Sequence, residues 1–428
     1  MKDDGLLKRG LQIKPEEWRA LLWASVYFFS VLSAYYIIRP IRDEMGVEGG
    51  IDHLPWLFTG TLIAIIVANI PFAALTKKFA RVKLISVSYR FFILNLLIFI
   101  GLIHFATPEQ KIWIGRIFFI WTSVFNLFVV SIFWILMVDV FNLPQSKRLF
   151  GFIAAGGTFG AVVGSSVTMT LAKHVPTAVL MLSSAAILEF AVFCVRRLAS
   201  LSEKLKLGAK AEEAHHPISG NVFSGISHTL SSTYLLNISL FTLLGTVTST
   251  TLYFQQAEIV HDHVANSAER IALFAQIEVL VNTITLLCQI FFTAKILKRF
   301  GVSVTLMLVP AFSLIGFGVL SVWPTVTAII AVQVIRRAGN FALARPAFES
   351  LFTVIPREDK YRAKAFMDTV VYRTGDQVGA WSKTLLAFFG FGATAFSLIA
   401  VPASFVWLIN SYWLGKRQRA LAPKAHSN

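Results

Sequence analysis

Residues 18–46 read WRALLWASVYFFSVLSAYYIIRPIRDEMG, an apolar stretch that ends in a cluster of charges. A membrane-spanning α-helix needs about 20 mostly apolar residues, and this stretch is long enough. Charged side chains at bilayer depth are costly, so they normally face a polar cavity and have a partner. The segment therefore predicts a membrane helix whose charged end, residues 39–44, faces a polar pathway.

Eleven more apolar stretches follow, so we expect an all-α membrane protein with twelve transmembrane helices. The chain of 428 residues is 56% hydrophobic and 14% charged, whereas a soluble domain has about 25% charged residues. The predicted spans are 18–46, 55–75, 84–105, 112–140, 149–172, 176–196, 232–258, 269–296, 302–322, 324–354, 364–389 and 391–414.

The cations lie in short clusters between the spans. Most of the 39 Lys and Arg residues occur in the first segment, the tail and every second loop, whereas the opposite loops hold Lys111, Lys173 and Arg270. The positive-inside rule then predicts a multi-pass protein of the bacterial inner membrane with both termini in the cytoplasm. The net charge of +16 does not indicate nucleic-acid binding, because the cations do not gather on one soluble face.

The polar stretch 197–231 predicts a cytoplasmic linker between two similar halves. We expect an N-terminal six-helix bundle over 1–196 and a C-terminal bundle with a short tail over 232–428. The halves repeat a basic signal after the second helix of each, KKF at 77–79 and KRF at 298–300. Two related six-helix halves are typical of the major-facilitator fold, whose substrate site lies between the halves near the membrane midplane.

The first span carries Arg39, Arg42 and Asp43. Arg39 and Asp43 are four residues apart and share a helix face, and Pro40 removes a backbone donor between them. The two guanidinium groups are candidates for binding an anion. The alternative is an interfacial cap, with side chains that extend toward the headgroups.

The tenth and eleventh spans carry the other candidate charges. Arg336 and Arg337 lie about a dozen residues into the tenth span, pointing about 100 degrees apart, so one is expected to bind substrate; the alternative is a buried structural ion pair. Arg373 and Asp376 in the eleventh span are spaced to pair and to exchange partners, and Asp376 is a candidate proton carrier. Glu278, in the apolar eighth span, is a second proton-carrier candidate, because a lone buried carboxylate can have a raised pKa; a structural role is the alternative.

The fifth span has small residues at four-residue spacing, GGTFG at 156–160 and then Gly164. This pattern predicts close helix packing rather than chemistry.

The sequence shows no sign of an enzyme, a metal site or a bound cofactor. It has no phosphate-binding loop and no nucleophile elbow or zinc-protease motif. Cys194 and Cys288 are expected to be buried free thiols. His215 and His216 have no third ligand nearby, so we expect a solvated linker there. Any active transport is therefore expected to be secondary.

Three motifs resemble the nucleotide transporter (ATP:ADP antiporter) family of plastids and intracellular bacteria. They are YYIIRPIRD at 35–43, the run 134–150 ending in SKRLF, and KYRAKAFMD at 360–368. The resemblance implies a twelve-helix major-facilitator fold, an anionic substrate, and a nucleotide-binding role for Arg42. In the fourth helix, where that family has an acidic residue, the chain reads TSVFN at 122–126, which makes Asn126 a polar candidate. The resemblance thus implies a relative that handles a nucleotide or another organic anion.

Together these observations predict a secondary active transporter of an organic anion, with ATP/ADP-type exchange as its main candidate activity. We expect a monomer in the lipid bilayer that binds a small anion and no nucleic acid. One alternative is a proton-coupled carrier of another anionic metabolite; another is a non-transporting membrane sensor or scaffold. The predicted site residues are Arg39, Arg42, Asn126, Arg336, Arg337 and Arg373 for substrate, with Asp43, Glu278 and Asp376 for coupling.

Overall fold

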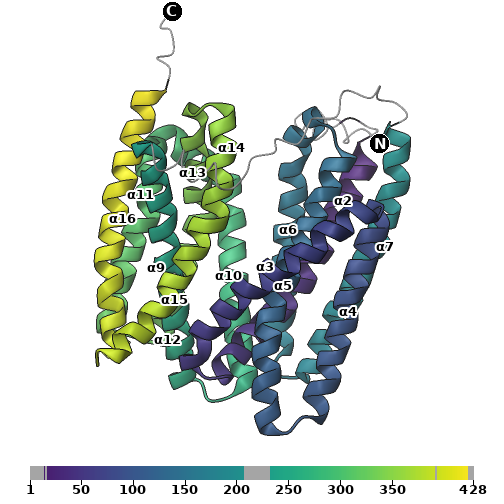
Figure 1. Ribbon diagram of the computed structural model, residues 1–428, viewed down its shortest axis with the longest axis horizontal. Coiled ribbons are helices and arrows are strands. Elements are labelled where there is room, and N and C mark those ends of the chain that lie inside the picture. The colour runs from purple at the N-terminus through teal and green to yellow at the C-terminus, as the bar shows by residue number, and fades with distance from the viewer. Residues whose placement is uncertain (1–13, 15–16, 207–231, 391–392, 423–428) are drawn as a thin grey trace, which may run out of the picture. The chain divides into compact units, whose positions relative to one another are not determined.

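The computed structural model describes residues 14, 17–206, 232–390 and 393–422. Nearly all of them are helical, and no strand occurs among them. They form two compact units (Figure 1). The first unit comprises the described residues within Met1–Gly49, Gly60–His215 and Asn266–Asn282, and the second those within Gly50–Thr59, His216–Ala265 and Thr283–Asn428.

The first unit is built around α2, which packs on α5, α6 and α7. The α2 helix continues through Pro40, as membrane helices often do because neighbouring groups compensate for the missing donor. Its helices are α2 (Trp18–Glu48), α3 (Leu54–Lys78), α4 (Arg81–Phe105), α5 (Pro108–Val140), α6 (Leu143–Leu171) and α7 (Thr177–Lys206). The short η1 (Ile51–His53) and the start of α3, up to Thr59, belong to the second unit.

Capping boxes begin two of these helices. Thr107 caps α5 by accepting a hydrogen bond from the Gln110 backbone N–H, and the Gln110 side chain accepts one from the Thr107 N–H. Asn142 and Gln145 make the same reciprocal pair at α6. Such boxes satisfy backbone donors that a helix start leaves without partners, which fixes where the helices begin.

The glycines of α6 lie directly against α2, as predicted. A Cβ at Gly160 would stand 2.2 Å from the Phe29 carbonyl oxygen, and one at Gly164 would stand 2.4 Å from the Ser33 carbonyl oxygen. The Ser33 hydroxyl donates to the Gly160 carbonyl oxygen over 2.8 Å. Two backbones therefore meet along this seam, and larger side chains have no room there.

The second unit centres on α9, which packs against α12, α15 and α16. Two of its spans contain short π-helical turns, η2 and η4. Its elements are α9 (Thr233–His263), α10 (Ser267–Phe291), α11 (Thr293–Val322), α12 (Val326–Gly339), η2 (Asn340–Ala344), α13 (Arg345–Leu351), η3 (Phe352–Val354), α14 (Arg357–Phe366), η4 (Met367–Val371), α15 (Tyr372–Phe388) and α16 (Ala393–Leu421). The first part of α10, up to Asn282, belongs to the first unit.

Each of the twelve predicted spans corresponds to a helical segment. Within the described part of the chain, ten helical spans are long and apolar enough to cross a membrane; α14–η4–α15 and α16 are the remaining two segments. The predicted linker 197–231 starts inside α7, which continues to Lys206, and 207–231 lies outside the described residues. The division into 1–196 and 232–428 stays a prediction.

Candidate functional site

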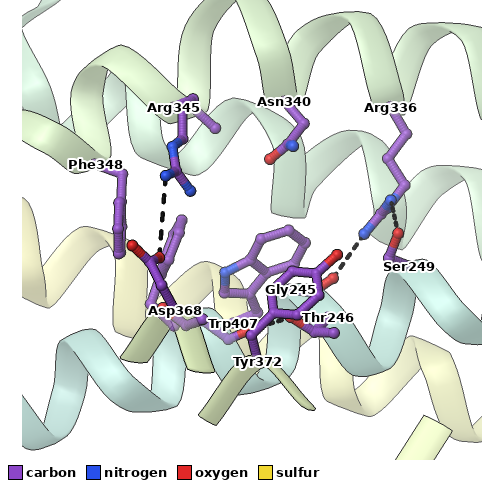
Figure 2. A pocket seen from close by; sticks show the side chains of 13 residues that line it. Gly245, Thr246, Ser249, Arg336, Asn340, Arg345, Phe348, Asp368, Tyr372 and Trp407 are labelled. Atoms are coloured by element: carbon purple, nitrogen blue, oxygen red, sulfur yellow. Dashed lines mark hydrogen bonds and ion pairs between the residues drawn. The ribbon is translucent and has the colours of Figure 1, made fainter. Parts of the chain in front are cut away.

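A pocket of about 130 Å³ lies within the second unit (Figure 2). Its walls come from α9, α12, η2, α13, η4, α15 and α16. The lining residues are Phe241, Thr242, Gly245, Thr246, Ser249, Arg336, Asn340, Ala344, Arg345, Phe348, Asp368, Tyr372 and Trp407.

Arg336 lies at one end of this pocket and is only 4% exposed. Its guanidinium donates to the Ser249 hydroxyl over 3.1 Å, to the Gly245 carbonyl oxygen over 2.8 Å and to the Thr248 hydroxyl over 3.3 Å. No carboxylate of the described residues lies within 4.0 Å of it. Neutral oxygens therefore orient the cation without neutralising it, which suits it to an anionic ligand.

Two buried donors in the pocket have no hydrogen-bond partner among the described residues, Arg336 Nε and Trp407 Nε1. The Arg336 guanidinium carbon lies 6.0 Å from the centre of the Trp407 ring, and Trp407 is 2% exposed. A buried donor left without an acceptor is costly, and buried polar groups are nearly always paired. Arg336 and Trp407 thus each contribute a donor whose burial no described acceptor compensates.

The opposite end of the pocket is occupied by Arg345 and Asp368 (Figure 2). Arg345 Nη2 lies 4.0 Å from Asp368 Oδ1, and Arg345 Nε lies 3.4 Å from Glu349 Oε1. The other Glu349 oxygen contacts Lys364 Nζ at 2.5 Å. Charges of both signs are thus concentrated at this end, in contrast to the single cation at the other.

Aromatic rings form part of the pocket wall. Phe241 stacks on Phe348 with ring centres 5.5 Å apart, and meets Trp407 edge-on at 5.4 Å. Tyr372 also lines the pocket (Figure 2). The Phe241, Phe348 and Trp407 rings are buried against one another, so they form an apolar wall beside the cations and hydroxyls of the pocket.

Both π-helical turns contribute residues to the pocket. Asn340 and Ala344 belong to η2, and Asp368 belongs to η4. Single π turns inside α-helices are rare and occur frequently at functional sites. Their presence in two neighbouring spans is a second reason to place the candidate site here.

In the first unit, the structure brings Arg39, Arg42, Asp43 and Glu278 together. Arg39 Nη1 lies 3.1 Å from Glu278 Oε2, and Arg42 Nη1 donates to Asp43 over 2.8 Å. The Arg42 guanidinium lies 3.7 Å from the centre of the Phe119 ring, a cation–π distance. The expectation of a lone carboxylate at Glu278 is wrong, because Glu278 pairs with Arg39. Sequence spacing alone could not show that α2 and α10 meet at this place.

A second ion pair joins the same two helices. Arg270 at the start of α10 is buried and pairs with Glu44 at 3.1 Å, and it also contacts Glu48. The charge pattern assigns Arg270 to a loop on the side opposite the termini, at the edge of the predicted span 269–296. Its burial is explained by these two acids at the end of α2.

The remaining predicted residues lie elsewhere. Asn126 is half-buried on α5 in the first unit. Arg373 lies 3.5 Å from Asp376, which also accepts a hydrogen bond from the Thr250 hydroxyl over 3.0 Å. These two and Arg337 belong to the second unit but are not among the described residues that line the pocket. Of the predicted substrate ligands, Arg336 lines it.

Several lining residues were not predicted, although a sequence signal exists for them. Arg336, Asn340, Ala344 and Phe348 recur every four residues, as do Phe241, Gly245 and Ser249, and Asp368 and Tyr372. Residues four apart share a helix face, so following that spacing from Arg336 would have found Asn340. Trp407 carries no such signal, because a Trp in an apolar span is ordinary. Among the described residues, no cluster of three metal-ligating side chains occurs.

No protein-family model matches the sequence, and no curated protein matches it. Solved structures do match in fold. A bacterial homologue of the iron transporter ferroportin, in an inward-facing state, is 12% identical, with 94% of this chain and 99% of that chain covered and a TM-score of 0.67. A D-xylose–proton symporter is 13% identical (90% and 96% covered, TM-score 0.61), and the nucleoside transporter NupG is 12% identical (95% and 99%, TM-score 0.55).

At these identities the similarity shows the fold alone. The predicted fold is thereby confirmed as an all-α membrane fold of major-facilitator type with ten to twelve long apolar helices. The arrangement in two six-helix halves stays a prediction. The closer resemblance to the nucleotide transporter family stays a prediction.

Proposed function

We propose that this protein is a secondary active transporter of an organic anion, with nucleotides as the first candidate substrates. The observation that carries the proposal is the pair of buried donors, Arg336 Nε and Trp407 Nε1, beside a guanidinium that no described carboxylate neutralises. A buried charge without a counter-ion is strongly destabilising. A bound anion would supply both the counter-charge and the missing acceptors.

The chemistry of the pocket lining supports a ligand with an anionic part beside an apolar part. The Phe241, Phe348 and Trp407 rings form an apolar wall, and Ser249 and Thr246 add hydroxyl groups. A nucleotide carries phosphate oxygens that match Arg336, and a pocket of about 130 Å³ has room for the phosphate part rather than for the whole molecule. The fold is shared with proteins named as transporters of a sugar and of nucleosides, which supports transport by alternating access rather than an enzymatic or scaffolding role.

The test is uptake of radiolabelled ATP into proteoliposomes that contain ADP or are empty. We expect uptake only with ADP inside, and at least a tenfold loss in Arg336→Gln, because hydrogen bonds to charged groups contribute about 1.5 to 3 kcal/mol. The matched control is Arg81→Gln, which removes a guanidinium from an exposed pair with Asp139 in the first unit. Uptake by Arg336→Gln at the wild-type rate would contradict the site.

A second candidate, a proton-coupled carrier of an anionic metabolite, is favoured by the Arg39–Glu278 pair. Protonation of Glu278 would neutralise one partner of an ion pair between α2 and α10, so proton binding would change how these helices hold together. In that case uptake would follow a pH gradient without any counter-substrate, and Glu278→Gln would abolish the gradient dependence. Uptake that ignores the pH gradient would exclude this candidate.

A further inference from the structure

The end of the pocket opposite Arg336 carries a loosely held ion pair. Arg345 and Asp368 face each other across it (Figure 2), with 4.0 Å between their nearest charged atoms. Their side chains are 53% and 42% exposed, so water screens the attraction. Pairs of this kind contribute about 0.2 to 1 kcal/mol. The two side chains can therefore separate at little cost.

The neighbouring charges leave Arg345 available. Its contact with Glu349 is 3.4 Å, whereas Glu349 meets Lys364 at 2.5 Å. Because Glu349 already has this closer cation, it depends little on Arg345. If Arg345 bound another partner instead of Glu349, the Glu349–Lys364 pair would therefore remain in place.

The backbone positions both members of the pair through irregular turns. Arg345 is the first residue after the π turn η2, and Asp368 is the second residue of the π turn η4. A π turn replaces the regular i to i−4 bonding with a wider turn, which changes the direction of the side chains that follow. Both turns present their charged residue to the same pocket, and this arrangement is independent of the ion-pair distance.

We propose that Asp368 is an internal counter-ion of Arg345, and that the substrate displaces it. The inference rests on the proposed function: one anionic group of the substrate binds at Arg336, and a second replaces Asp368 at Arg345. The displaced carboxylate remains hydrated, since it is already 42% exposed. The pocket thereby selects anions with two separated negative groups over singly anionic ones, because a single group gains Arg336 alone.

The experiment measures binding of inorganic phosphate and of pyrophosphate to the purified full-length protein by isothermal titration calorimetry. We expect the wild-type protein to prefer pyrophosphate. Asp368→Asn removes the competing charge, so it should bind pyrophosphate up to about fivefold more tightly with little change for phosphate. Asp368→Ser provides a second variant with the same loss of charge. Arg345→Gln should lose the preference and keep phosphate binding.

Matched controls come from the exposed Arg81–Asp139 pair of the first unit. Asp139→Asn and Arg81→Gln make the same chemical changes away from the pocket and should leave both affinities unchanged. Equal affinity for the two anions in wild type and in both Asp368 variants, with binding lost in Arg336→Gln, would overturn this inference and keep the proposed function. Failure of the wild-type protein to bind either anion would overturn both.

Discussion

At the scale of single residues, the pocket depends on how Arg336 is solvated. Its contacts are two hydroxyl groups and a carbonyl oxygen, which replace water but carry no net charge. A carboxylate in their place would have formed a closed ion pair with little affinity left for a ligand. Arg336 therefore has a fixed orientation and a positive charge that no neighbouring carboxylate balances. Recognition of an anion requires both.

Trp407 gives a second test, because Phe keeps an aromatic ring but is smaller than indole and lacks the Nε1 donor. Trp407→Phe eliminates the Nε1 donor, so we expect about tenfold weaker pyrophosphate binding, as for the loss of one hydrogen bond to a charged group. The control is Trp121→Phe. Trp121 Nε1 is also buried without a described partner, but that ring lines an apolar cleft of α3, α4 and α5. Equal effects of the two substitutions would contradict the donor role.

Glu17, just before α2, should make the protein sensitive to acid. Although burial opposes its ionisation, hydrogen bonds from Arg148, the Lys14 backbone and Gln145 hold the pKa of Glu17 below its ordinary value of 4.5. Because the pKa is lower in the folded state, this stabilisation is complete above the ordinary carboxylate pKa and is lost as the pH falls through the lowered value.

Thermal unfolding in detergent at pH 7 and pH 3 tests this effect. At pH 7, Glu17→Gln should cost about 1.5 to 3 kcal/mol, since it removes hydrogen bonds to a charged group. At the lower pH the difference between wild type and variant should shrink. A difference that stays constant over this range would show that the ionised carboxylate is not what stabilises the start of α2.

At the scale of helices, the α2–α6 seam reverses the usual effect of a helical glycine. Gly→Ala inside a helix normally stabilises by about 0.5 to 1 kcal/mol. At Gly160 the added methyl would stand 2.2 Å from the Phe29 carbonyl oxygen, so the helices must separate. Overpacking of this kind costs about 1 to 3 kcal/mol, and we expect Gly160→Ala to lower the unfolding temperature.

Gly101 in α4 is the matched control, because nothing lies within 4 Å of a Cβ placed there. Gly101→Ala should raise the unfolding temperature slightly or leave it unchanged. If Gly160→Ala proved as stable as Gly101→Ala, the close approach of α2 and α6 would be contradicted.

At the scale of the whole molecule, the distribution of cations predicts the orientation in the membrane. Lys and Arg dominate the loops on the side of the termini, so a C-terminal fusion to green fluorescent protein should fluoresce in bacteria. A fusion to alkaline phosphatase at the same place should be inactive, because that enzyme folds only outside the cytoplasm. The reverse result would invert the topology while leaving the fold unchanged.

The helices could be predicted from hydropathy, because lipid allows few structures other than apolar helices. Their ends were harder to predict, as with α7, which continues to Lys206 through polar residues that hydropathy excludes. Arg336 stood out because a charge in an apolar span is costly. The role of Trp407 and the pairing of Arg39 with Glu278 could not be predicted. Both depend on which helices pack together, and neither spacing nor composition contains that information.

The two π turns have a consequence for how the spans could vary. A π turn is an α-helix with one residue inserted, and one residue corresponds to about 100 degrees of rotation. Deleting a single residue within Asn340–Ala344 would restore a regular helix but rotate Arg336 relative to Arg345. The angular relation between the two cations is therefore encoded in chain length rather than in side-chain identity. Within Asn340–Ala344, this angular relation should survive substitutions that keep the chain length but not a deletion.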